Sequence, residues 1–294
     1  MSRVVVIGNA GLDLPLAVPR LPLPGETLIG NPEARAPGGK GLNQAIVAAR
    51  CGGEVRFCAP LGNDAAEANL LEGCLAREGF AELHLPRLPY PTDFSLLMVL
   101  PNGENSIVST SACSLALTFA QAEPALHDLG QGDVVLVQGN LALETTDAIL
   151  AAARRQGAMT IFNPAPFWPG AEKLVGHCSL VIANRIEAQA LGSSLRVARA
   201  AIVTRGADGC TLIEGGCRQS FAAEPITAID TTGCGDAFCG VMAALLAGGR
   251  TAHEAIPRAQ KAAALAATRP GAFAALPLRT DLHSILADRN GPLS

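Results

Sequence analysis

Aromatic and charged side chains are both scarce in this sequence of 294 residues. Phe, Trp and Tyr make up 4% of the chain and Asp, Glu, Lys and Arg 16%, whereas the AVILMFWYC set makes up 49%. This composition excludes an intrinsically disordered chain, which needs low hydrophobicity and high net charge. It predicts a core built mainly from Ala, Val, Leu and Ile, and the length fits one large domain or two small ones.

A surplus of basic residues is also missing, because the formal net charge is −4 at neutral pH. The chain therefore lacks the overall basic footprint of a nucleic-acid-binding protein, although local basic groups could still bind a small anion. No stretch reaches the ~18 consecutive apolar residues of a membrane span. The N-terminal apolar run in MSRVVVIGNAG is too short for a secretion signal. We therefore expect a soluble, cytoplasmic protein with no nucleic-acid or membrane partner.

Cysteine pairs with metal-site or redox-motif spacing are missing, although the chain contains nine cysteines. The odd number and irregular spacing predict free thiols in a reducing compartment rather than a disulfide framework. Neither CGGEVRFC nor CGDAFC has the CxxC form, so no zinc site is expected.

Short β-branched runs alternate with Ala-rich stretches over most of the chain. Several of the runs are apolar on both faces, which is typical of strands in a parallel sheet covered by helices. The stretches between them end at Gly pairs or near Pro-Gly, as helices commonly do. The alternation predicts a doubly wound α/β fold. Predicted strands cover 3–8, 54–62, 133–139, 158–163, 179–184 and 200–206, and predicted helices cover 41–53, 143–157, 234–249 and 255–271.

Two segments break this alternation. Residues 12–36 are rich in Pro and have no helical period, and residues 93–111 have the pattern of two strands around Pro-Asn-Gly-Glu-Asn, a hairpin signal. We expect them to form a small β-sheet, a lid or interface, from about 12–36 and 91–112. Because no linker interrupts the chain, residues 1–294 are expected to form a single domain.

The most informative loop has the sequence DTTGCGD and runs from Asp230 to Asp236. A helix that begins here would present unpaired backbone N–H groups, and Gly233 and Gly235 would let the backbone approach a ligand closely. The N–H groups of Cys234, Gly235 and Asp236 could then hold a phosphoryl group, while Asp236 accepts a proton from the attacking hydroxyl. The alternative is that Asp236 only caps the helix.

A second Gly-rich loop, APGGKGLNQA, covers residues 36–45. It is not a Walker A motif, because Ala34 stands where that motif needs Gly and no Ser or Thr follows Gly41. Lys40 and Asn43 could instead bind the hydroxyl groups of a polar ligand at the start of a helix. The alternative is a tight turn with an exposed lysine.

Two further loops follow predicted strands. Asn184 ends one strand and Glu187 falls in the first turn of the next helix, so the pair could share a hydrated Mg²⁺ or a phosphate. The alternative for this pair is a helix-capping box. The sequence VTRGADG at 203–209 could let a nucleotide approach the backbone through its glycines.

These four loops, in this order, resemble the ribokinase (PfkB) family of carbohydrate kinases. The Gly-Gly signature of the family corresponds to residues 38–45, its Asn-x-x-Glu motif to Asn184–Glu187, and its Asp-Thr-Thr-Gly-Ala-Gly-Asp-x-Phe signature to 230–238. The resemblance covers essentially the whole chain. It implies a three-layer α/β/α sandwich with a β lid, and transfer of the γ-phosphoryl group of ATP to a sugar hydroxyl.

The resemblance also implies a role for each matching residue, the cofactors ATP, Mg²⁺ and K⁺, and a homodimer through lid residues such as Phe94, Leu96 and Met98. The implied roles are the general base for Asp236; backbone stabilisation of the phosphoryl group for Gly233, Cys234 and Gly235; sugar binding for Asp13, Gly39, Lys40, Asn43 and Asp236; nucleotide binding for Asn184, Thr204, Gly206 and Gly209; Mg²⁺ binding through water for Glu187; and monovalent-cation binding for Asp230 and Thr232.

This sequence departs from the family pattern at four places. Cys234 stands where Ala is usual, and residues 269–277 lack the Ser that often helps to close the cation site. Gly11 and Asn140 replace an Asn and a Glu found in ribose-specific members, which leaves a nucleoside or pseudouridine kinase open. A non-catalytic sugar- or nucleotide-binding regulator is a rival of another class, and the intact Asp236 argues against it. A dinucleotide-dependent oxidoreductase would need Gly-x-Gly-x-x-Gly, which VVVIGNAG lacks.

Overall fold

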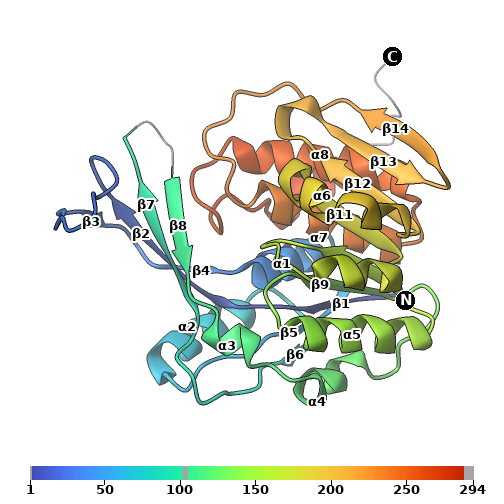
Figure 1. The fold of residues 1–294 in the computed structure, drawn as a ribbon, viewed down its shortest axis with the longest axis horizontal. Helices are drawn as coiled ribbons and strands as arrows, with labels where there is room; N and C mark the ends of the chain where they lie inside the picture. The colour runs from blue at the N-terminus through green and yellow to red at the C-terminus, as the bar shows by residue number, and fades with distance from the viewer. Residues whose placement is uncertain (1, 102–104, 288–294) are drawn as a thin grey trace.

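The computed structural model of the chain describes residues 2–101 and 105–287, and its largest element is a nine-stranded sheet (Figure 1). Neighbouring strands from β12 to β6 run parallel, and β13 and β14 are added antiparallel at one edge. All six strands predicted from the sequence are present, and β6, β13 and β14 were not predicted. The order across the sheet is β14 (Cys217–Phe221), β13 (Cys210–Glu214), β12 (Ala200–Thr204), β11 (Leu180–Asn184), β10 (Met159–Asn163), β9 (Val134–Gln138), β1 (Arg3–Ile7), β5 (Glu54–Cys58) and β6 (Glu82–His84).

The strand order changes direction between β1 and β9. From β1 the chain continues outward to β5 and β6, and it then returns to β9 and builds the other half of the sheet. In open α/β sheets, ligands bind beyond the carboxyl ends of the strands at such a switch point. Asn9 follows β1 here, and Asn140 follows β9.

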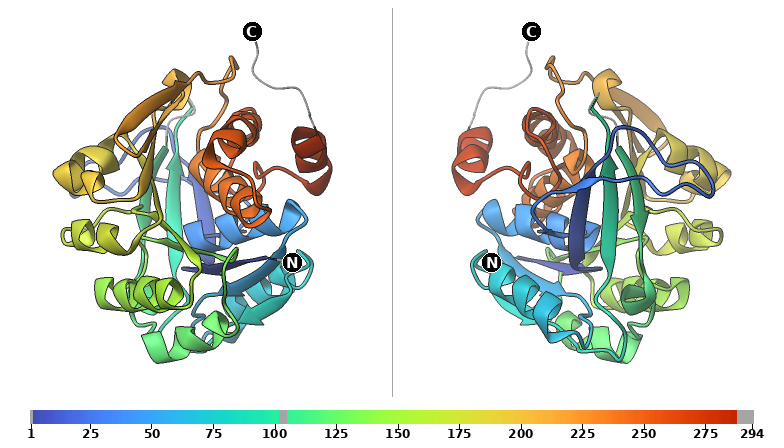
Figure 2. Two further views of the ribbon diagram at one scale, coloured as in Figure 1. Left: turned by 90° about the vertical axis from the view of Figure 1, so that its right-hand side faces the viewer. Right: turned by 90° about the vertical axis from the view of Figure 1, so that its left-hand side faces the viewer.

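Helices cover both faces of the large sheet, because the side chains on both faces of its central strand β1 are buried. Val4 and Val6 of β1 pack in one hydrophobic cluster, and Val5 and Ile7 pack in the other. Figure 2 shows the resulting three layers, which confirm the predicted α/β/α arrangement. The first cluster includes α1 (Lys40–Arg50), α2 (Ala65–Leu75), α7 (Cys234–Ala247), α8 (Ala252–Ala267) and α9 (Arg279–Ala287), and the second includes α4 (Phe119–Ala122), α5 (Leu143–Arg155) and α6 (Arg185–Leu191).

The helix predicted over 255–271 is wrong at both ends. It begins at Ala252 because Thr251 and Glu254 form a capping box, in which the Glu254 carboxylate accepts from the Thr251 backbone N–H at 2.9 Å. It ends at Ala267, and Pro257 lies inside it. Helices α2 and α9 were not predicted.

A smaller sheet stands beside the large one, as Figure 1 shows for β2, β7 and β8. It confirms the two strands predicted within 93–111, and the turn residues 102–104 lie outside the described part of the chain. We call it the small sheet; it consists of β3 (Asn31–Pro32), β2 (Gly11–Ala17), β7 (Phe94–Val99) and β8 (Asn105–Ser109) in that order, with β4 (Ala36–Gly38) paired to β2.

Across residues 2–101 and 105–287, no helix has the length and apolar character that would carry it through a bilayer.

Candidate active site

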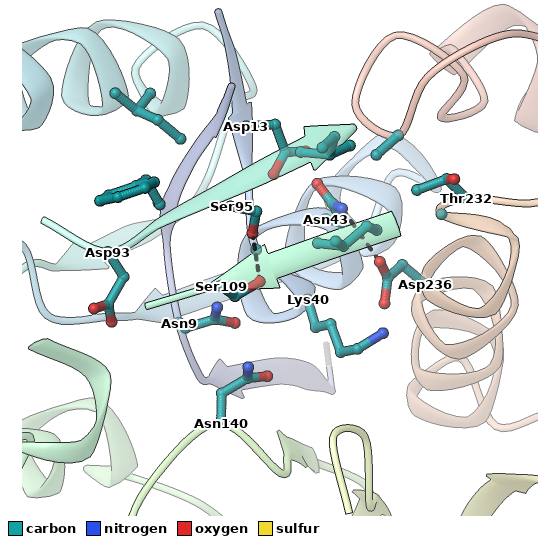
Figure 3. A pocket seen from close by; sticks show the side chains of 18 of the residues that line it. Asn9, Asp13, Lys40, Asn43, Asp93, Ser95, Ser109, Asn140, Thr232 and Asp236 are labelled. Carbon is teal, nitrogen blue, oxygen red and sulfur yellow. Dashed lines mark hydrogen bonds between the residues drawn. The ribbon is translucent and has the colours of Figure 1, made fainter. Parts of the chain in front are cut away.

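A polar cavity of about 460 Å³ lies at the carboxyl edge of the large sheet, next to the small sheet (Figure 3). Its lining comes from the small sheet, from α1 and α7, and from the loops that follow strands of the large sheet, such as those of Asn9 and Asn140. Among the predicted site residues, the lining includes Asp13, Gly39, Lys40, Asn43, Thr232, Gly233 and Asp236. The structure thus brings the predicted sugar-binding residues and the predicted base together, although they lie as far apart as 13 and 236 in the sequence.

Asp236 lies in the first turn of α7 and is 95% buried, but it does not cap the helix. The N-cap is Gly233, in the left-handed conformation with φ 79°, and no side chain caps this end. The Asp236 carboxylate instead accepts from Asn43 Nδ2 at 3.2 Å and from Gln44 Nε2 at 2.9 Å. The capping alternative for Asp236 is therefore wrong, and its carboxylate faces α1.

Lys40 is half-buried beside Asp236 rather than exposed at a turn. The negative charge of Asp236 raises the pKa of Lys40, burial opposes this effect, and Glu187 adds to the rise. The side chain therefore stays a cation at neutral pH, positioned to neutralise negative charge in the cavity.

The glycines of the second loop let α1 begin against the end of β1. Gly39 has φ 104°, and a Cβ on Gly41 would lie 2.6 Å from the Asn9 backbone nitrogen. The Gly41 N–H donates to Asn9 Oδ1 at 3.1 Å. This close approach places Lys40 and Asn43 at the carboxyl edge of the large sheet. A residue larger than glycine at position 41 would push the helix away from it.

Asp13 enters the cavity from β2 and is 92% buried. Burial, reinforced by the charge of Asp236, raises the pKa of Asp13 to about 6, and a hydrogen bond with Ser95 opposes the rise. Asp13 therefore changes charge close to neutral pH. The buried carboxylates of Asp13 and Asp236 repel each other until a ligand or a proton intervenes.

Two acceptor atoms at the cavity have no hydrogen-bond partner among the described residues. They are Asn43 Oδ1, in a side chain 97% buried, and Asn140 Oδ1. Buried polar atoms in native proteins nearly always have a partner. Since both asparagines line the cavity, a ligand that donates hydrogen bonds, such as a polyhydroxy compound, would satisfy them.

Asp230 holds the loop before α7 in shape. Its Oδ1 accepts from the Thr232 backbone N–H at 2.9 Å and hydroxyl at 2.6 Å, and its Oδ2 accepts from the Gly271 N–H at 2.9 Å. Burial acts to raise the pKa of Asp230, but these hydrogen bonds outweigh it, so the pKa is lowered. The ionised carboxylate thus ties the loop to the segment after α8.

Asn184 and Glu187 form the capping box that was the alternative for this pair. Asn184 Oδ1 accepts from the Glu187 N–H at 2.9 Å, and the Glu187 carboxylate accepts from the Asn184 N–H and from Asn184 Nδ2, each at 2.8 Å. Burial raises the pKa of Glu187, and the Asn184 hydrogen bond and the charge of Lys40 oppose it. Neither residue lines the cavity, although Glu187 lies within electrostatic reach of Lys40 and Asp236.

The predicted nucleotide-binding residues lie along the same edge but outside the cavity. Thr204 is the register partner of Asn184 in the pair β11–β12. Gly206 and Gly209 have φ 56° and 77°, and they lie in the turn that joins β12 to β13. The structure places them beside one another at the ends of neighbouring strands, where the role inferred for them from the sequence stays a prediction.

Cys234 and Gly235 do not line the cavity either. Burial, together with the charges of Asp230 and Asp236, raises the pKa of the Cys234 thiol to about 11. At neutral pH the side chain is therefore an uncharged thiol of low reactivity.

Three buried amide residues behind the cavity were missed in the sequence. Gln44 donates to Asn163 Oδ1 at 3.0 Å as well as to Asp236, and Gln138 Nε2 donates to Gln44 Oε1 at 2.9 Å. The signal was present, because β9, β10 and β11 each end in an amide residue: Gln138, Asn163 and Asn184.

Outside the cavity, three side chains of types that can bind a metal ion lie together: Glu82, His84 and His127. One possible ligand atom of each lies within 4.8 Å of the others. The buried Arg56 contacts this group, with its Nε 2.8 Å from Glu82 Oε1. The guanidinium supplies the positive charge that a metal ion would otherwise provide, so the group is explained as the counter-ion site of a buried arginine.

Comparison with known proteins agrees with this fold. A model of the pfkB family of carbohydrate kinases matches residues 1–279. The ribokinase of Bacillus subtilis is 30% identical over 294 residues, which cover 98% of this chain and 100% of that protein. The crystal structure of ribokinase from Thermotoga maritima superposes with a TM-score of 0.88 at 28% identity and covers 98% of this chain and 100% of its own. A ribokinase from Cryptococcus neoformans, solved in complex with ADP, has a TM-score of 0.81 at 26% identity and covers 97% and 99%.

These findings define a kinase that uses ATP to phosphorylate a sugar hydroxyl. The chain belongs to the pfkB family of carbohydrate kinases, because the family model covers almost its whole length.

Proposed function

We propose that this chain transfers the γ-phosphoryl group of ATP to a hydroxyl of a small, ribose-like sugar bound in the polar cavity. The observation that carries the proposal is the convergence of Asp236, Lys40, Asp13 and the unpartnered Asn43 Oδ1 on that cavity. Its similarity to several ribokinases, one solved in complex with ADP, supports both the substrate class and the nucleotide.

In the proposed reaction, Asp236 takes the proton of the attacking hydroxyl as the hydroxyl oxygen bonds to the γ-phosphorus. The bond between that phosphorus and the bridging oxygen breaks, and ADP leaves with the electron pair. Backbone N–H groups from Gly233 to Asp236 hold the phosphoryl oxygens, and Lys40 neutralises their charge. Phosphoryl transfer depends mainly on such positioning and charge stabilisation, and we propose that the small sheet closes over the sugar and excludes water.

Mg²⁺ and a monovalent cation fit the oxygen donors at the ends of this site. The carboxylate of Glu187 would hold Mg²⁺ through water, and Asp230 with Thr232 would hold K⁺; the lowered pKa of Asp230 keeps it ionised. When bound, these ions would neutralise the charge of the ATP phosphates. Both carboxylates are already fixed by hydrogen bonds, which suits ligands that must keep one orientation.

The nucleoside or pseudouridine kinase remains the second candidate, because Gly11 weakens the case for ribose itself and leaves this alternative open. A Cβ on Gly11 would lie 2.3 Å from the Asp93 carbonyl oxygen, so the Asn of ribose-specific relatives does not fit this backbone. Asn140 likewise offers an amide where those relatives offer a carboxylate. Two contacts used for ribose are therefore changed in this chain.

The small sheet has a second face that supports a proposed homodimer. Ser95, Leu97, Ile107 and Ser109 line the cavity, and Leu96, Met98 and Val108 alternate with them along β7 and β8. Phe94, which was predicted to face the partner with Leu96 and Met98, also borders the cavity. The side chain of Val108 is strongly exposed, at 60%. We propose that a second copy of the chain covers this face.

We further propose that residues 1–294 act as one domain and that the protein works in the cytoplasm, where its nine free cysteines would stay reduced.

The decisive experiment measures ADP release with a panel of pentoses, hexoses and nucleosides, with and without K⁺. We expect turnover with a pentose or a closely related sugar. Turnover with nucleosides alone would favour the second candidate. Binding of sugar or nucleotide without ADP release from any acceptor would favour a non-catalytic regulator and overturn the proposal.

A further inference from the structure

The base of the proposed reaction is connected to a chain of buried amides that crosses three elements. Gln44 of α1 donates to Asp236 Oδ1 at 2.9 Å and to Asn163 Oδ1 at 3.0 Å. Asn163, at the end of β10, donates through Nδ2 to the backbone carbonyl of Ile182 in β11 at 2.8 Å. Gln44 is fully buried and does not line the cavity, so it does not touch a bound sugar.

The donor and the acceptor of each hydrogen bond between these buried amides follow from the backbone carbonyl of Ile182, where the series ends. The Ile182 carbonyl can only accept, so Asn163 must present its NH₂ group there and its oxygen toward Gln44. Gln44 must then present its own NH₂ group to Asn163, and the same group reaches Asp236. Gln138 completes the arrangement, because its Nε2 donates to the Gln44 oxygen that faces away from Asp236.

We propose that Gln44 is a positioning residue for the catalytic base: it holds Asp236 Oδ1 and reserves Oδ2 for the proton of the substrate hydroxyl. A proton on Oδ1 would face the N–H of Gln44, whose amide cannot turn because Asn163 and Gln138 fix it. Oδ2 accepts the longer hydrogen bond of the two, from Asn43 Nδ2 at 3.2 Å, and Asn43 lines the cavity, so Oδ2 is the carboxylate oxygen next to the cavity. This role rests on the proposed function, since it presupposes that Asp236 removes a proton.

The arrangement also keeps a negative charge on Asp236 in unfavourable surroundings. Asp13 from β2 and Glu187 from α6 repel it, and the thiols of Cys234 and Cys239 on α7 remain neutral. Lys40 from α1 is the opposing cation. A hydrogen bond donated to the charged form of a carboxylate favours that form, so the Gln44 N–H stabilises the negative charge of Asp236 against these neighbours.

The test replaces Gln44 by Met, which has a similar length and no donor. Hydrogen bonds to charged groups are worth enough for us to expect kcat to fall about 10- to 100-fold. We expect KM for both substrates to change less than about threefold and the acidic limb of the kcat–pH profile to move to higher pH. Asn163→Leu should also lower kcat and move the acidic limb to higher pH, but by less than Gln44→Met, because it only frees the Gln44 amide to turn. Gln138→Met should have the smallest effect on both.

Thr160→Val is the matched control. Thr160 is also a fully buried polar residue of β10, but its hydroxyl donates to the His177 carbonyl, away from the cavity. If Gln44 only stabilised the fold, both variants would lower the melting temperature and leave the pH profile of the remaining active enzyme unchanged.

The outcomes separate this role from the proposed function. A wild-type chain without ADP release from any acceptor would overturn both. An active wild type whose Q44M variant keeps its kcat and pH profile would overturn the positioning role alone. If Q44M does not fold, N163L decides by the same two readouts, and an unchanged profile in N163L would equally refute the role.

Discussion

Two groups of polar residues occupy the same edge of the large sheet, and they differ in how far the protein satisfies them. In the cavity, Asn43 Oδ1 and Asn140 Oδ1 have no hydrogen-bond partner within the described ranges, and burial raises the pKa of Asp13. Beside the cavity, both carboxylate oxygens of Asp230 and of Glu187 already accept hydrogen bonds from the chain. The first group therefore contains acceptors that still lack a hydrogen bond, whereas every carboxylate oxygen of the second group already accepts one.

We expect the difference to reflect the ligand proposed for each group. An unpartnered acceptor gains most from a ligand that donates hydrogen bonds, and a sugar hydroxyl is such a ligand. A carboxylate fixed by N–H donors has lost its freedom to turn but keeps its charge, which suits a cation or a hydrated ion. The contrast therefore separates a sugar end from an ion end of the proposed site.

Asp236→Asn should give the largest effect, because it removes the proposed base and leaves the shape of the site. We expect kcat to fall by about 10² to 10⁴, the range that a positioned base contributes, while ATP affinity stays close to wild type. The measurement is ADP release at saturating substrates, with nucleotide affinity from calorimetry. Asp230→Asn is the matched control, and we expect its loss to depend on K⁺ concentration. A D236N enzyme with near wild-type turnover would show that the base lies elsewhere.

Asn43→Ala should weaken sugar binding, and Asn184→Ala should weaken the use of ATP or Mg²⁺. Losing one hydrogen bond costs about 1 kcal/mol, so N43A should raise the sugar KM about fivefold and leave the ATP KM unchanged. Lys40→Ala should also raise the sugar KM more than the ATP KM, and it should lower kcat as well, because Lys40 neutralises the phosphoryl charge in the proposed reaction. N184A should raise the ATP or Mg²⁺ requirement instead and also lower stability by about 1 kcal/mol through the lost helix cap. The reverse ranking of the two KM values would refute the division.

Acidification should affect the sugar end before the ion end, since the pKa of Asp13 is raised to about 6 and that of Asp230 is lowered. Below pH 6 Asp13 is protonated and becomes a weaker acceptor, so sugar KM should rise from pH 7 to pH 5. Asp13→Asn should flatten that profile. A profile that keeps its slope in D13N would mean that another group titrates.

The same substitution has a consequence for stability with a defined sign. The pKa of Asp13 is higher in the folded chain than its ordinary value of 3.8, so its ionisation costs folding free energy. The cost is absent below about pH 4 and complete above about pH 6, where it reaches about 3 kcal/mol. The melting temperature of D13N relative to wild type should therefore be higher at pH 7.5 than at pH 4.5.

Most of the fold could be predicted because its information is local. The central strands are apolar on both faces and the helices end at glycines, so six strands and four helices followed from pattern alone. The edge strands β6 and β14 escaped prediction because they are short or largely exposed and carry no apolar run. The start of α8 was misplaced because a capping box, rather than the apolar period, sets it.

The candidate site was predictable only in part, because its hydrogen bonds join distant residues. The motifs identified Asp236, Lys40 and Asn43, and the structure brings these together. The bond between Gln44 and Asn163 spans 119 positions, and no spacing rule connects them. Asn184 and Glu187 have one spacing that fits both a capping box and an ion site, so the sequence could not choose between them.

Cys234→Ala should have the smallest effect, although Cys234 is the departure inside the most specific motif. Its pKa is raised to about 11, so the thiol is protonated at neutral pH, and only its backbone N–H serves the phosphoryl group in the proposed reaction. Alanine keeps that N–H, and we expect kcat to stay within about twofold of wild type. Alkylation by iodoacetamide should also be slower at Cys234 than at the exposed Cys217, as followed by mass spectrometry. Rapid alkylation at Cys234 with loss of turnover would instead mean that the thiol is activated, and the motif would then contain a redox-sensitive position.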